Sequence, residues 1–588
     1  MKILGISAWY HDSAAAFTEN GKILFAAQEE RYTRRRHDAA FPAMAISAGL
    51  KYLGLTLSDI DLVVYYEKPF LKFDRLLENY FTTAPRGFAA FCKAMPVWLG
   101  EKLFIKNRIL RELNRIEPGA IPVSKLRFAE HHLSHAASAF YSSPFHDAAV
   151  LTVDGVGEWA TTTISLGTGR HIKKLHEIRY PHSLGLFYSA FTAFLGFKVN
   201  SGEYKVMGLA PYGKPVYKQI ILEKVLHLRP DGSFQLQMQY FGYTDRLSMF
   251  TPQLEQLFGQ KARMPETELT AFHYDLAASV QAVLEEAVLG LVRYAVNETG
   301  NRNLCMAGGV ALNCVANARI RESGLVDDLW VQPAAGDAGA ATGAALALWH
   351  SEQGEERIPL KPDGMQYAAL GEAYNPQQTE TILKQNQAVY TRIENPAQLY
   401  QKVATLLAEG LTAGWFQGRM EFGPRALGQR SILADARREG MREKLNATVK
   451  NREMFRPFAP VVMEEFSEEW FSAGADRYMM QTVQVQKTTG KPDLPAITHV
   501  DGSARLQLVN EAAHPELHGL LTAFHGLTGC PVLVNTSFNV RGEPLVENPQ
   551  QAWECFMRSG LDVLCIGEFL LIKAQQTAAV AAKSFLAD

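Results

Sequence analysis

The sequence predicts an α/β protein whose first half is built from a repeated unit. An apolar strand over 2–9 leads into a polar loop with His11 and Asp12, and a further strand, a turn and a third strand follow. The same order of strand, acidic loop, strand, turn and strand returns from Ala148, with Asp154 in the loop. A pattern that occurs twice indicates one structural unit used twice. We therefore expect two α/β halves of the same topology.

Two histidines and two aspartates form the pattern with the clearest chemistry. His131 and His135 are four residues apart and share one face of a predicted helix, where both imidazoles can reach one ion. Asp154 ends an apolar strand, and Asp337 opens an Ala/Gly-rich helix, so both stand where ligands are commonly presented. This set suits Fe, Mn or Zn better than calcium. Paired histidines also cap helices or lie hydrogen-bonded in cores, so the spacing alone leaves a structural role open.

A glycine-rich loop, Gly308–Gly309, lies between a short strand around Leu304 and a helix that runs through Ile320. A long helix over 280–296 precedes it and is ended by Gly300. Backbone amides of such a loop can approach phosphate oxygens at the positive end of the next helix. We therefore expect a nucleotide beside the metal, in the cleft between two halves, as in actin-like folds.

Length, composition and charge are those of a soluble globular protein with several domains. The chain has 588 residues, too many for one core. Its hydrophobic content of 47% and charged content of 20% are ordinary. The net charge of −2 gives no overall field for nucleic acid or for a membrane surface. The basic run 31–36 stands between acidic residues and is interpreted as a solvated face.

Cysteine usage and hydropathy favour a cytoplasmic protein. The six cysteines form no CxxC pair, so neither a disulfide scaffold nor a zinc knuckle is indicated. No uninterrupted apolar stretch reaches the roughly 18 residues that a membrane span needs. The first residues run directly into a strand rather than into a leader. We expect a protein of the reducing cytoplasm that is neither secreted nor membrane-spanning.

A domain boundary is predicted after the Ala-rich helix that ends near His350. The stretch 351–378 is charged and contains several glycines and prolines, and a regular helix resumes at Pro396, followed by a strand over 412–416. The predicted division is a first domain over 1–355, a linker region over 356–395 and a second domain over 396–588.

A series of motifs resembles one enzyme family. In order, they are ISAWYHDSAA (6–15), EER (29–31), HD (37–38), FP (41–42), HHLSH (131–135), VDGVGE (153–158), VMGLAPYG (206–213), GGVALN (308–313), EFGPRALG (421–428), Lys450 with FRPFAP (455–460), and NTSFN (535–539). From end to end they resemble the NodU/CmcH-type O-carbamoyltransferases. The resemblance implies a Kae1-like, actin-like first domain and a YrdC-like α/β second domain that forms carbamoyladenylate.

In the second domain the resemblance implies a site where carbamoyl phosphate and ATP, with its Mg²⁺, give carbamoyladenylate and pyrophosphate. Two polyanionic substrates require fixed cations, and guanidinium groups can bind phosphate oxygens with two hydrogen bonds. The candidate residues are Arg425, Lys450, Arg456, Arg505 and Ser537 for catalysis and Asn535 for binding. We expect Ser537 and Asn535 in a loop after a strand over 531–534.

In the first domain the resemblance implies transfer of the carbamoyl group to a hydroxyl of a small natural product, as in antibiotic and other secondary-metabolite biosynthesis. The implied metal ligands are His131, His135, Asp154 and Asp337, with Fe(II) favoured over Mn or Zn, and the metal polarises the carbamoyl carbonyl. The implied contacts to the AMP portion are Gly308, Gly309 and Asn313.

The roles of two further residues, His11 and Arg36, are less specific. His11 is either the general base that deprotonates the acceptor hydroxyl or a structural residue that orders the loop of Asp12. Arg36, a candidate cofactor-binding residue, falls where many relatives carry lysine, which keeps the charge but changes the geometry. Two segments, 81–113 and 226–264, are expected to face the acceptor. A homodimer is left open, and no nucleic-acid or membrane partner is expected.

Three other classes of protein share part of this pattern. A tRNA threonylcarbamoyl transferase has related folds but calls for a basic face, which a pI near 6.8 does not offer. A hydrogenase-maturation carbamoyl transferase resembles this fold but adds an acylphosphatase domain and paired CxxC motifs, which this sequence lacks. A catalytically idle, nucleotide-binding protein of the sugar-kinase type is the remaining alternative.

Overall fold

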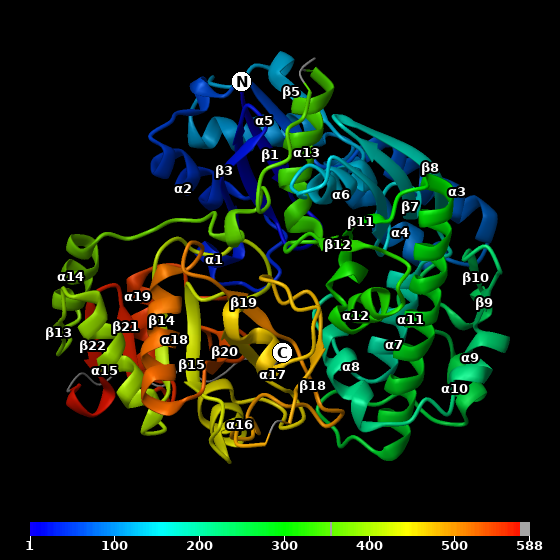
Figure 1. Cartoon of the computed structure of the whole chain (residues 1–588). Coiled ribbons are helices and arrows are strands. Elements are labelled where there is room, and N and C mark those ends of the chain that lie inside the picture. The colour runs from blue at the N-terminus through cyan, green and yellow to red at the C-terminus, as the bar shows by residue number, and fades with distance from the viewer. Residues whose placement is uncertain (353–355, 488, 577–588) are drawn as a thin grey trace. The chain divides into compact units, whose positions relative to one another are not determined.

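The structure is a computed structural model that describes residues 1–352, 356–487 and 489–576. The chain divides into two compact units (Figure 1). The first unit consists of Met1–Glu29 and His37–Gly364, and the second of Glu30–Arg36 and Met365–Asp588. The short segment Glu30–Arg36 therefore belongs to the second unit, although the first unit flanks it on both sides in the sequence. The region 356–395 contains a helix, α14 (Pro376–Gln385), and a short strand, β13 (Thr391–Arg392).

Two five-stranded sheets of the same topology form the first unit. Their strands are β1 (Lys2–Ser7), β2 (Ala14–Glu19), β3 (Lys22–Gln28), β4 (Leu62–Tyr65) and β5 (Leu126–Phe128) in one sheet and β6 (Asp147–Val153), β7 (Ala160–Thr168), β8 (His171–Arg179), β11 (Asn303–Ala307) and β12 (Asp328–Val331) in the other. The strand orders are β3-β2-β1-β4-β5 and β8-β7-β6-β11-β12. In both sheets the central strand is antiparallel to one neighbour and parallel to the other. The predicted duplication of one α/β unit is confirmed.

Local sequence explains the first copy. The strand residues of β1 and β2 are almost all buried and mostly apolar, as expected for strands covered on both faces. The β2–β3 turn places Asn20 and Gly21 at φ 49° and 76°. Both are in the left-handed region that Asn-Gly pairs favour in hairpins. The turn therefore fixes the register of the hairpin.

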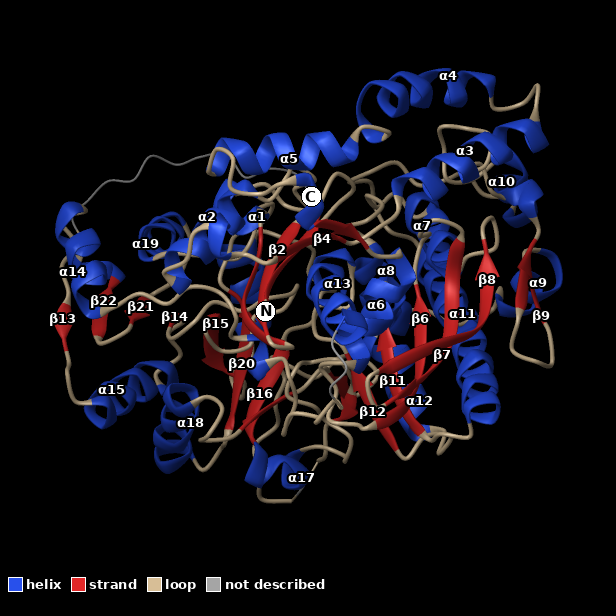
Figure 2. Ribbon diagram, turned by 90° about the horizontal axis from the view of Figure 1, so that it is seen from above, coloured by secondary structure: helices blue, strands red, loops and turns tan. Residues whose placement is uncertain are grey.

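The helices of the first unit cover these sheets (Figure 2). They are α2 (Ala43–Leu53), α3 (Pro69–Thr83), α4 (Phe88–Val97), α5 (Ile105–Ile116), α6 (His131–Phe140), α7 (Leu184–Phe194), α8 (Glu203–Leu209), α9 (Lys218–Lys224), α10 (Pro252–Phe258), α11 (Ala271–Thr299), α12 (Cys314–Glu322) and α13 (Asp337–Glu352), with a small hairpin of β9 (Leu226–Leu228) and β10 (Phe234–Leu236). The Ala-rich α13 packs on α6 and on β1 and β2. As predicted, α11 ends at Gly300, whose φ is 64°.

The second unit is an α/β domain around one mixed eight-stranded sheet. Besides β13, its strands are β14 (Ala413–Phe416), β15 (Arg430–Asp435), β16 (Ala459–Met463), β19 (Gln507–Val509), β20 (Val532–Ser537), β21 (Val563–Ile566) and β22 (Phe569–Ile572), and β17 (Val483–Gln484) pairs separately with β18 (Ser503–Ala504). The order in the large sheet is β13-β22-β21-β14-β15-β20-β16-β19. Its helices are α14, α1 (Glu30–Thr33), α15 (Pro396–Ala408), α16 (Met441–Lys444), α17 (Ser467–Trp470), α18 (Pro515–Thr528) and α19 (Pro549–Arg558).

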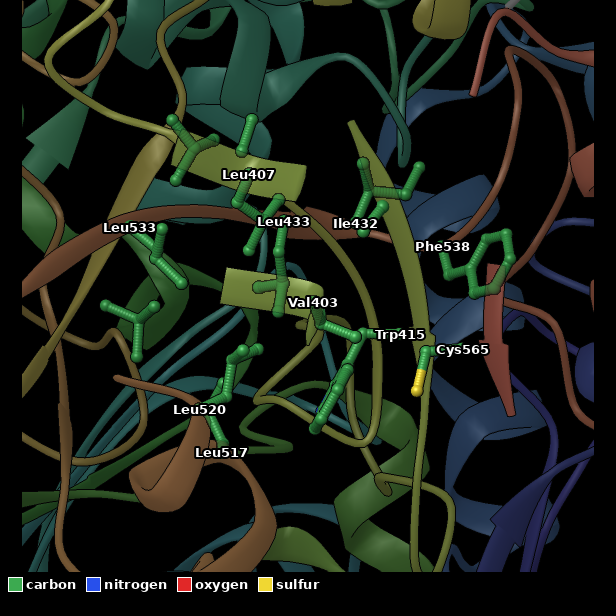
Figure 3. Packing of buried hydrophobic residues seen from close by; sticks show 14 of the residues in the cluster. Val403, Leu407, Trp415, Ile432, Leu433, Leu517, Leu520, Leu533, Phe538 and Cys565 are labelled. Atoms are coloured by element: carbon green, nitrogen blue, oxygen red, sulfur yellow. The ribbon is translucent and has the colours of Figure 1, made fainter. Parts of the chain in front are cut away.

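The core of the second unit lies between this sheet and its helices. Figure 3 shows Val403 of α15 and Leu517 of α18 together with Trp415 and Leu433 of the sheet, all of them fully or almost fully buried. One sequence prediction was wrong here. Asn535 and Ser537 do not follow the strand in a loop but form part of β20, because its pairing with β15 continues to Ser537.

Within the described ranges, which omit 353–355, 488 and 577–588, no helix is long and apolar enough to cross a membrane.

Candidate active sites in the two units

The four predicted metal-ligand side chains of the first unit lie together. One ligand atom from each of His131, His135, Asp154 and Asp337 falls within 4.8 Å of the others. His131 Nε2 lies 3.1 Å from Asp154 Oδ2 and 3.1 Å from His135 Nε2. His135 Nε2 lies 3.5 Å from Asp337 Oδ1. Two imidazole nitrogens and two carboxylates thus converge on one point.

Three elements bring these side chains to that point. Asp154 directly follows β6, while Asp337 is the first residue of α13, and α6 begins at His131. Glu158, from the VDGVGE motif, fixes the start of α6, because its carboxylate accepts the backbone N–H of His131 at 3.0 Å. Tyr66 Oη lies 3.5 Å from Asp337 Oδ2. Sequence reasoning assigned no role to Glu158 or Tyr66.

The two carboxylates of the cluster favour positive charge beside them. Burial lowers the pKa of His131, but its hydrogen bond to Asp154 and the charge of Asp337 raise it to about 9. Burial raises the pKa of Asp154, but His131 and His135 hold it well below its usual range. Among the residues that the structure describes, the buried Nδ1 atoms of both histidines have no hydrogen-bond partner. A divalent transition metal fits this set, since it binds neutral imidazole and ionised carboxylate and balances the charge.

His11 lies beside the cluster and is oriented by Asp12. Its Nδ1 is 2.9 Å from Asp12 Oδ2, and its Nε2 is 3.9 Å from Asp337 Oδ2. Asp12 is shared, since its Oδ1 lies 2.7 Å from Nδ1 of His37. Burial lowers the pKa of His11, while Asp337, Asp12 and Asp154 raise it to about 9. This pKa favours protonated His11 while the cluster holds no cation. Positive charge bound by Asp154 and Asp337 would lower the pKa and leave Nε2 able to accept a proton.

The Gly308–Gly309 loop contacts the metal-ligand cluster directly. Gly308 has φ 92°, and a Cβ there would lie 2.3 Å from the carbonyl oxygen of Val153. Glycine is required at this position, because β6 and β11 run parallel and end side by side. The N–H of Gly309 donates to Asp154 Oδ1 at 2.8 Å and so orients this ligand.

Asn313 has structural partners. Its Oδ1 accepts the N–H of Ala316 at 3.0 Å and caps α12. Its amide also exchanges two hydrogen bonds with Gln281, at 2.9 and 3.0 Å. If the side chain of Asn313 bound a nucleotide, it would have to give up one or more of these hydrogen bonds.

In the second unit, Lys450 is the centre of the predicted cation site. Its side chain is buried, and Nζ lies among four oxygen acceptors, which belong to Ser537 and Asn539. The distance to Asn539 Oδ1 is 2.8 Å. Burial and the charges of Arg452, Arg456 and Arg36 lower the pKa of Lys450. Lys450 thus lies in a positive electrostatic potential, which a bound anion would reduce.

Arg36 belongs to this cation group. It lies in the segment Glu30–Arg36 of the second unit and acts on the charge of Lys450. Arg456 does so too, and it also pairs with Glu453 at 3.4 Å. The structure therefore brings Arg36, Lys450, Arg456 and Ser537 together.

A buried amide network leads from this group toward Arg425. Asn535 Nδ2 donates to Gln507 Oε1 at 2.6 Å, and Gln507 pairs with Asp476 in an isolated bridge. Burial raises the pKa of Asp476 to about 6, although Arg425 opposes the rise. Asn535 Oδ1 has no hydrogen-bond partner in the part of the chain that the structure describes. Arg505 lies two residues before Gln507, between β18 and β19, with its Nε similarly unsatisfied.

Glu421 of the EFGPRALG motif shapes the loop that carries Arg425. Its Oε1 accepts three backbone N–H groups, from Leu427, Gln429 and Arg430, at 2.9 to 3.0 Å. The side chain is 1% exposed. Glu421 therefore fixes the conformation of this loop.

The interpretation of 31–36 as a solvated face was wrong. Arg31 is 1% exposed, and its Nη2 donates to the carbonyl oxygen of Gly423 at 2.6 Å. Arg34 donates to the carbonyl oxygens of Pro544 and Leu545. Guanidinium groups can bind buried carbonyl oxygens with several N–H donors, which a count of charges along the sequence does not reveal.

In the second unit the sequence analysis also missed three residues near the site: Asp476, Gln507 and Asn539. Asn539 ends the NTSFN motif, so its position in that motif was a usable signal. Asp476 and Gln507 meet the site through long-range strand contacts, for which the sequence contains no local signal.

Comparison with known proteins agrees with the division of the chain into two units. A model of the carbamoyltransferase N-terminus matches residues 2–346, and one of the carbamoyltransferase C-terminus matches 404–573. An uncharacterized protein of Synechocystis sp. is 49% identical over 98% of this chain and 97% of its own length. The nodulation protein NolNO of Sinorhizobium fredii is 35% identical over 96% of this chain and 80% of its own length.

Among solved structures, component A of the (R)-2-hydroxyglutaryl-CoA dehydratase of Acidaminococcus fermentans is similar with a TM-score of 0.33 and 15% identity. It covers 60% of this chain and 98% of its own. A TM-score this low says nothing about activity.

The protein thus combines two units. The first is a duplicated α/β unit with a buried cluster of metal-ligand donors, and the second is an α/β unit with buried cations. The chain belongs to the carbamoyltransferase family and is a transferase of carbamoyl groups.

Proposed function

We propose that the second unit makes carbamoyladenylate from carbamoyl phosphate and ATP, and that the first unit transfers the carbamoyl group to a hydroxyl of a small-molecule natural product. One observation carries the proposal. The metal-ligand donors and the cation group around buried Lys450 belong to different units, which supports two separate reactions.

In the second unit, Lys450, Arg456 and Arg36 supply positive charge to the phosphates. Carbamoyl phosphate is hydrolysed to carbamate and inorganic phosphate. A carbamate oxygen then forms a bond to the α-phosphorus of ATP, and pyrophosphate leaves as its Mg²⁺ complex. Fixed cations of this kind contribute several kcal/mol to phosphoryl chemistry, because charge grows on oxygens that they already face.

In the first unit, His131, His135, Asp154 and Asp337 would hold one divalent ion, with Fe(II) favoured and Mn or Zn as alternatives. A bound ion of this kind supplies Lewis acidity to a carbonyl oxygen. His11 accepts the proton of the acceptor hydroxyl as that oxygen bonds to the carbamoyl carbon, and AMP leaves. Asp12 supports this role, because it holds Nδ1 of His11 and leaves Nε2 facing the cluster.

The test separates the two reactions with variants of one residue in each unit. Lys450→Ala is expected to abolish pyrophosphate release from ATP and carbamoyl phosphate, since it removes the central cation. His135→Ala is expected to retain pyrophosphate release but to lose the roughly one metal ion per chain found by elemental analysis, since four ligands make a single site.

Matched controls are available in each unit. Lys444→Ala removes a half-exposed lysine from α16, and His146→Ala removes a half-exposed histidine of the first unit. Both controls should behave like the wild type. Pyrophosphate release at the native rate by Lys450→Ala would refute the assigned adenylation site, and unchanged metal content in His135→Ala would refute the assigned metal site.

A further inference from the structure

Three helices of the first unit carry an exposed apolar surface. The helices α3, α4 and α5 and their connections form the segment 69–116, here called the helical excursion, which leaves the first sheet after β4 and returns before β5. Figure 2 shows α4 at the outer edge of the first unit. The residues of the two candidate sites lie elsewhere in the sequence.

The apolar helix α4 buries none of its own residues. Its ten residues, FAAFCKAMPV, are all described by the structure, and none is buried. Its inner side is tethered to α3, because Phe91 stacks on Tyr80 at 4.0 Å between ring centroids. Its outer side exposes Phe88 by 61%, and Leu99 in the following turn is 53% exposed. A helix of a globular protein usually buries its apolar stripe, and contiguous exposed apolar side chains mark an interaction surface.

The excursion is also strongly basic. It contains nine basic and four acidic side chains, which gives it a net charge of +5, whereas the whole chain has −2. Lys72 pairs with Glu67 at 2.6 Å and Arg108 with Glu101 at 2.7 Å, but the basic side chains of the excursion still outnumber these carboxylates. Lys93 and Lys106 are exposed. The expectation that no membrane surface is bound rested on charge averaged over the whole chain, which conceals this segment.

We propose that the helical excursion docks on the anionic surface of a lipid bilayer. Phe88 and Leu99 enter the headgroup region, while Lys93 and Lys106 face lipid phosphates. Exposed aromatic and aliphatic side chains next to lysine and arginine are the combination by which a helix lies on such a surface. A second copy of this chain is disfavoured as the occupant, because a two-fold contact would set a charge of +5 against the same charge.

The experiment measures sedimentation of the full-length protein with phosphatidylcholine vesicles, with and without phosphatidylglycerol. Binding is expected only with phosphatidylglycerol and should weaken as salt is raised. Lys93→Glu with Lys106→Glu should weaken binding by at least twentyfold, since each lost cation accounts for about a fivefold effect. Phe88→Ser with Leu99→Ser should also weaken it, and neither pair should alter folding because all four side chains are exposed.

Matched controls replace equally exposed side chains outside the excursion. Val500→Ser changes a residue that is 53% exposed, and Arg293→Glu reverses an exposed charge on α11. Both controls should bind like the wild type. Equal binding by all variants, absence of binding to phosphatidylglycerol vesicles, or self-association that Phe88→Ser with Leu99→Ser abolishes would each overturn the proposal.

Discussion

Gly343 of α13 lies directly against Ser134 of α6, so closely that a Cβ on Gly343 would stand 1.8 Å from the carbonyl oxygen of Ser134. The two helices therefore touch through their backbones. One carries Asp337 and the other His131 and His135, so this contact sets the distance between the ligands. The metal-ligand cluster therefore depends on the close contact between α6 and α13.

Replacing Gly343 should disturb the metal site from a distance. In Gly343→Ala the new methyl group must push the helices apart, at a cost of about 1–3 kcal/mol in the free energy of unfolding. We expect lower metal content and slower carbamoyl transfer, with pyrophosphate release unchanged. Gly526→Ala is the control, because this helical glycine has open space around it and alanine favours helices. Normal metal content in Gly343→Ala would contradict the argument.

Ligand binding at Lys450 should take up a proton. Burial and three arginines lower the pKa of Lys450 in the free protein. An anionic ligand raises that pKa, so protons are bound between the two pKa values and affinity falls as the pH rises through this range. Calorimetric titration with a non-hydrolysable ATP analogue in buffers of different ionisation enthalpy measures the uptake. Lys450→Met should abolish it and Lys444→Met should not; an unchanged uptake in Lys450→Met argues against this origin.

Glu421→Gln should loosen the loop of Arg425. The substitution weakens three hydrogen bonds to a buried carboxylate, which predicts a loss of about 1–3 kcal/mol in stability. The KM for carbamoyl phosphate should rise more than kcat falls, since the cation is displaced but retained. Urea unfolding and steady-state kinetics test this, with exposed Glu439→Gln as the neutral comparison. A wild-type KM would leave Glu421 with a purely structural role.

The segment Glu30–Arg36 should stabilise the second unit. Arg31 is buried, pairs with Glu30 at 3.1 Å and donates to Gly423. Arg31→Ala leaves Glu30 without this partner, and breaking a buried pair costs about 3–5 kcal/mol. The unfolding transition of the second unit, followed by tryptophan fluorescence, should shift to lower temperature, whereas Arg35→Ala at an exposed position should have little effect. Equal shifts in both variants would speak against a specific contact.

The metal-ligand cluster could be predicted from sequence because its signals are local. The spacing of His131 and His135 fixes a helix face, and Asp154 and Asp337 stand at the end of a strand and the start of a helix. The fold class could also be predicted from local signals, because both copies of the repeat have the same strand order.

The second site was only partly predictable because long-range contacts build it. Asn535 looked like a loop residue, since polar side chains are rare in buried strands, but its amide bonds to Gln507 allow it to stay in β20. Arg31 looked solvated because a charge run along the chain has the same appearance whether it is exposed or bonded to buried carbonyls. Neither contact has a signal in the neighbouring sequence.

The central claim is that adenylate formation and carbamoyl transfer take place at separate sites. The most direct test supplies synthetic carbamoyladenylate and an accepted hydroxyl compound to Lys450→Ala and to His135→Ala and measures the carbamoylated product. We expect near-native product formation by Lys450→Ala and none by His135→Ala. Failure of carbamoyladenylate to rescue Lys450→Ala, or full product formation by His135→Ala, would contradict it.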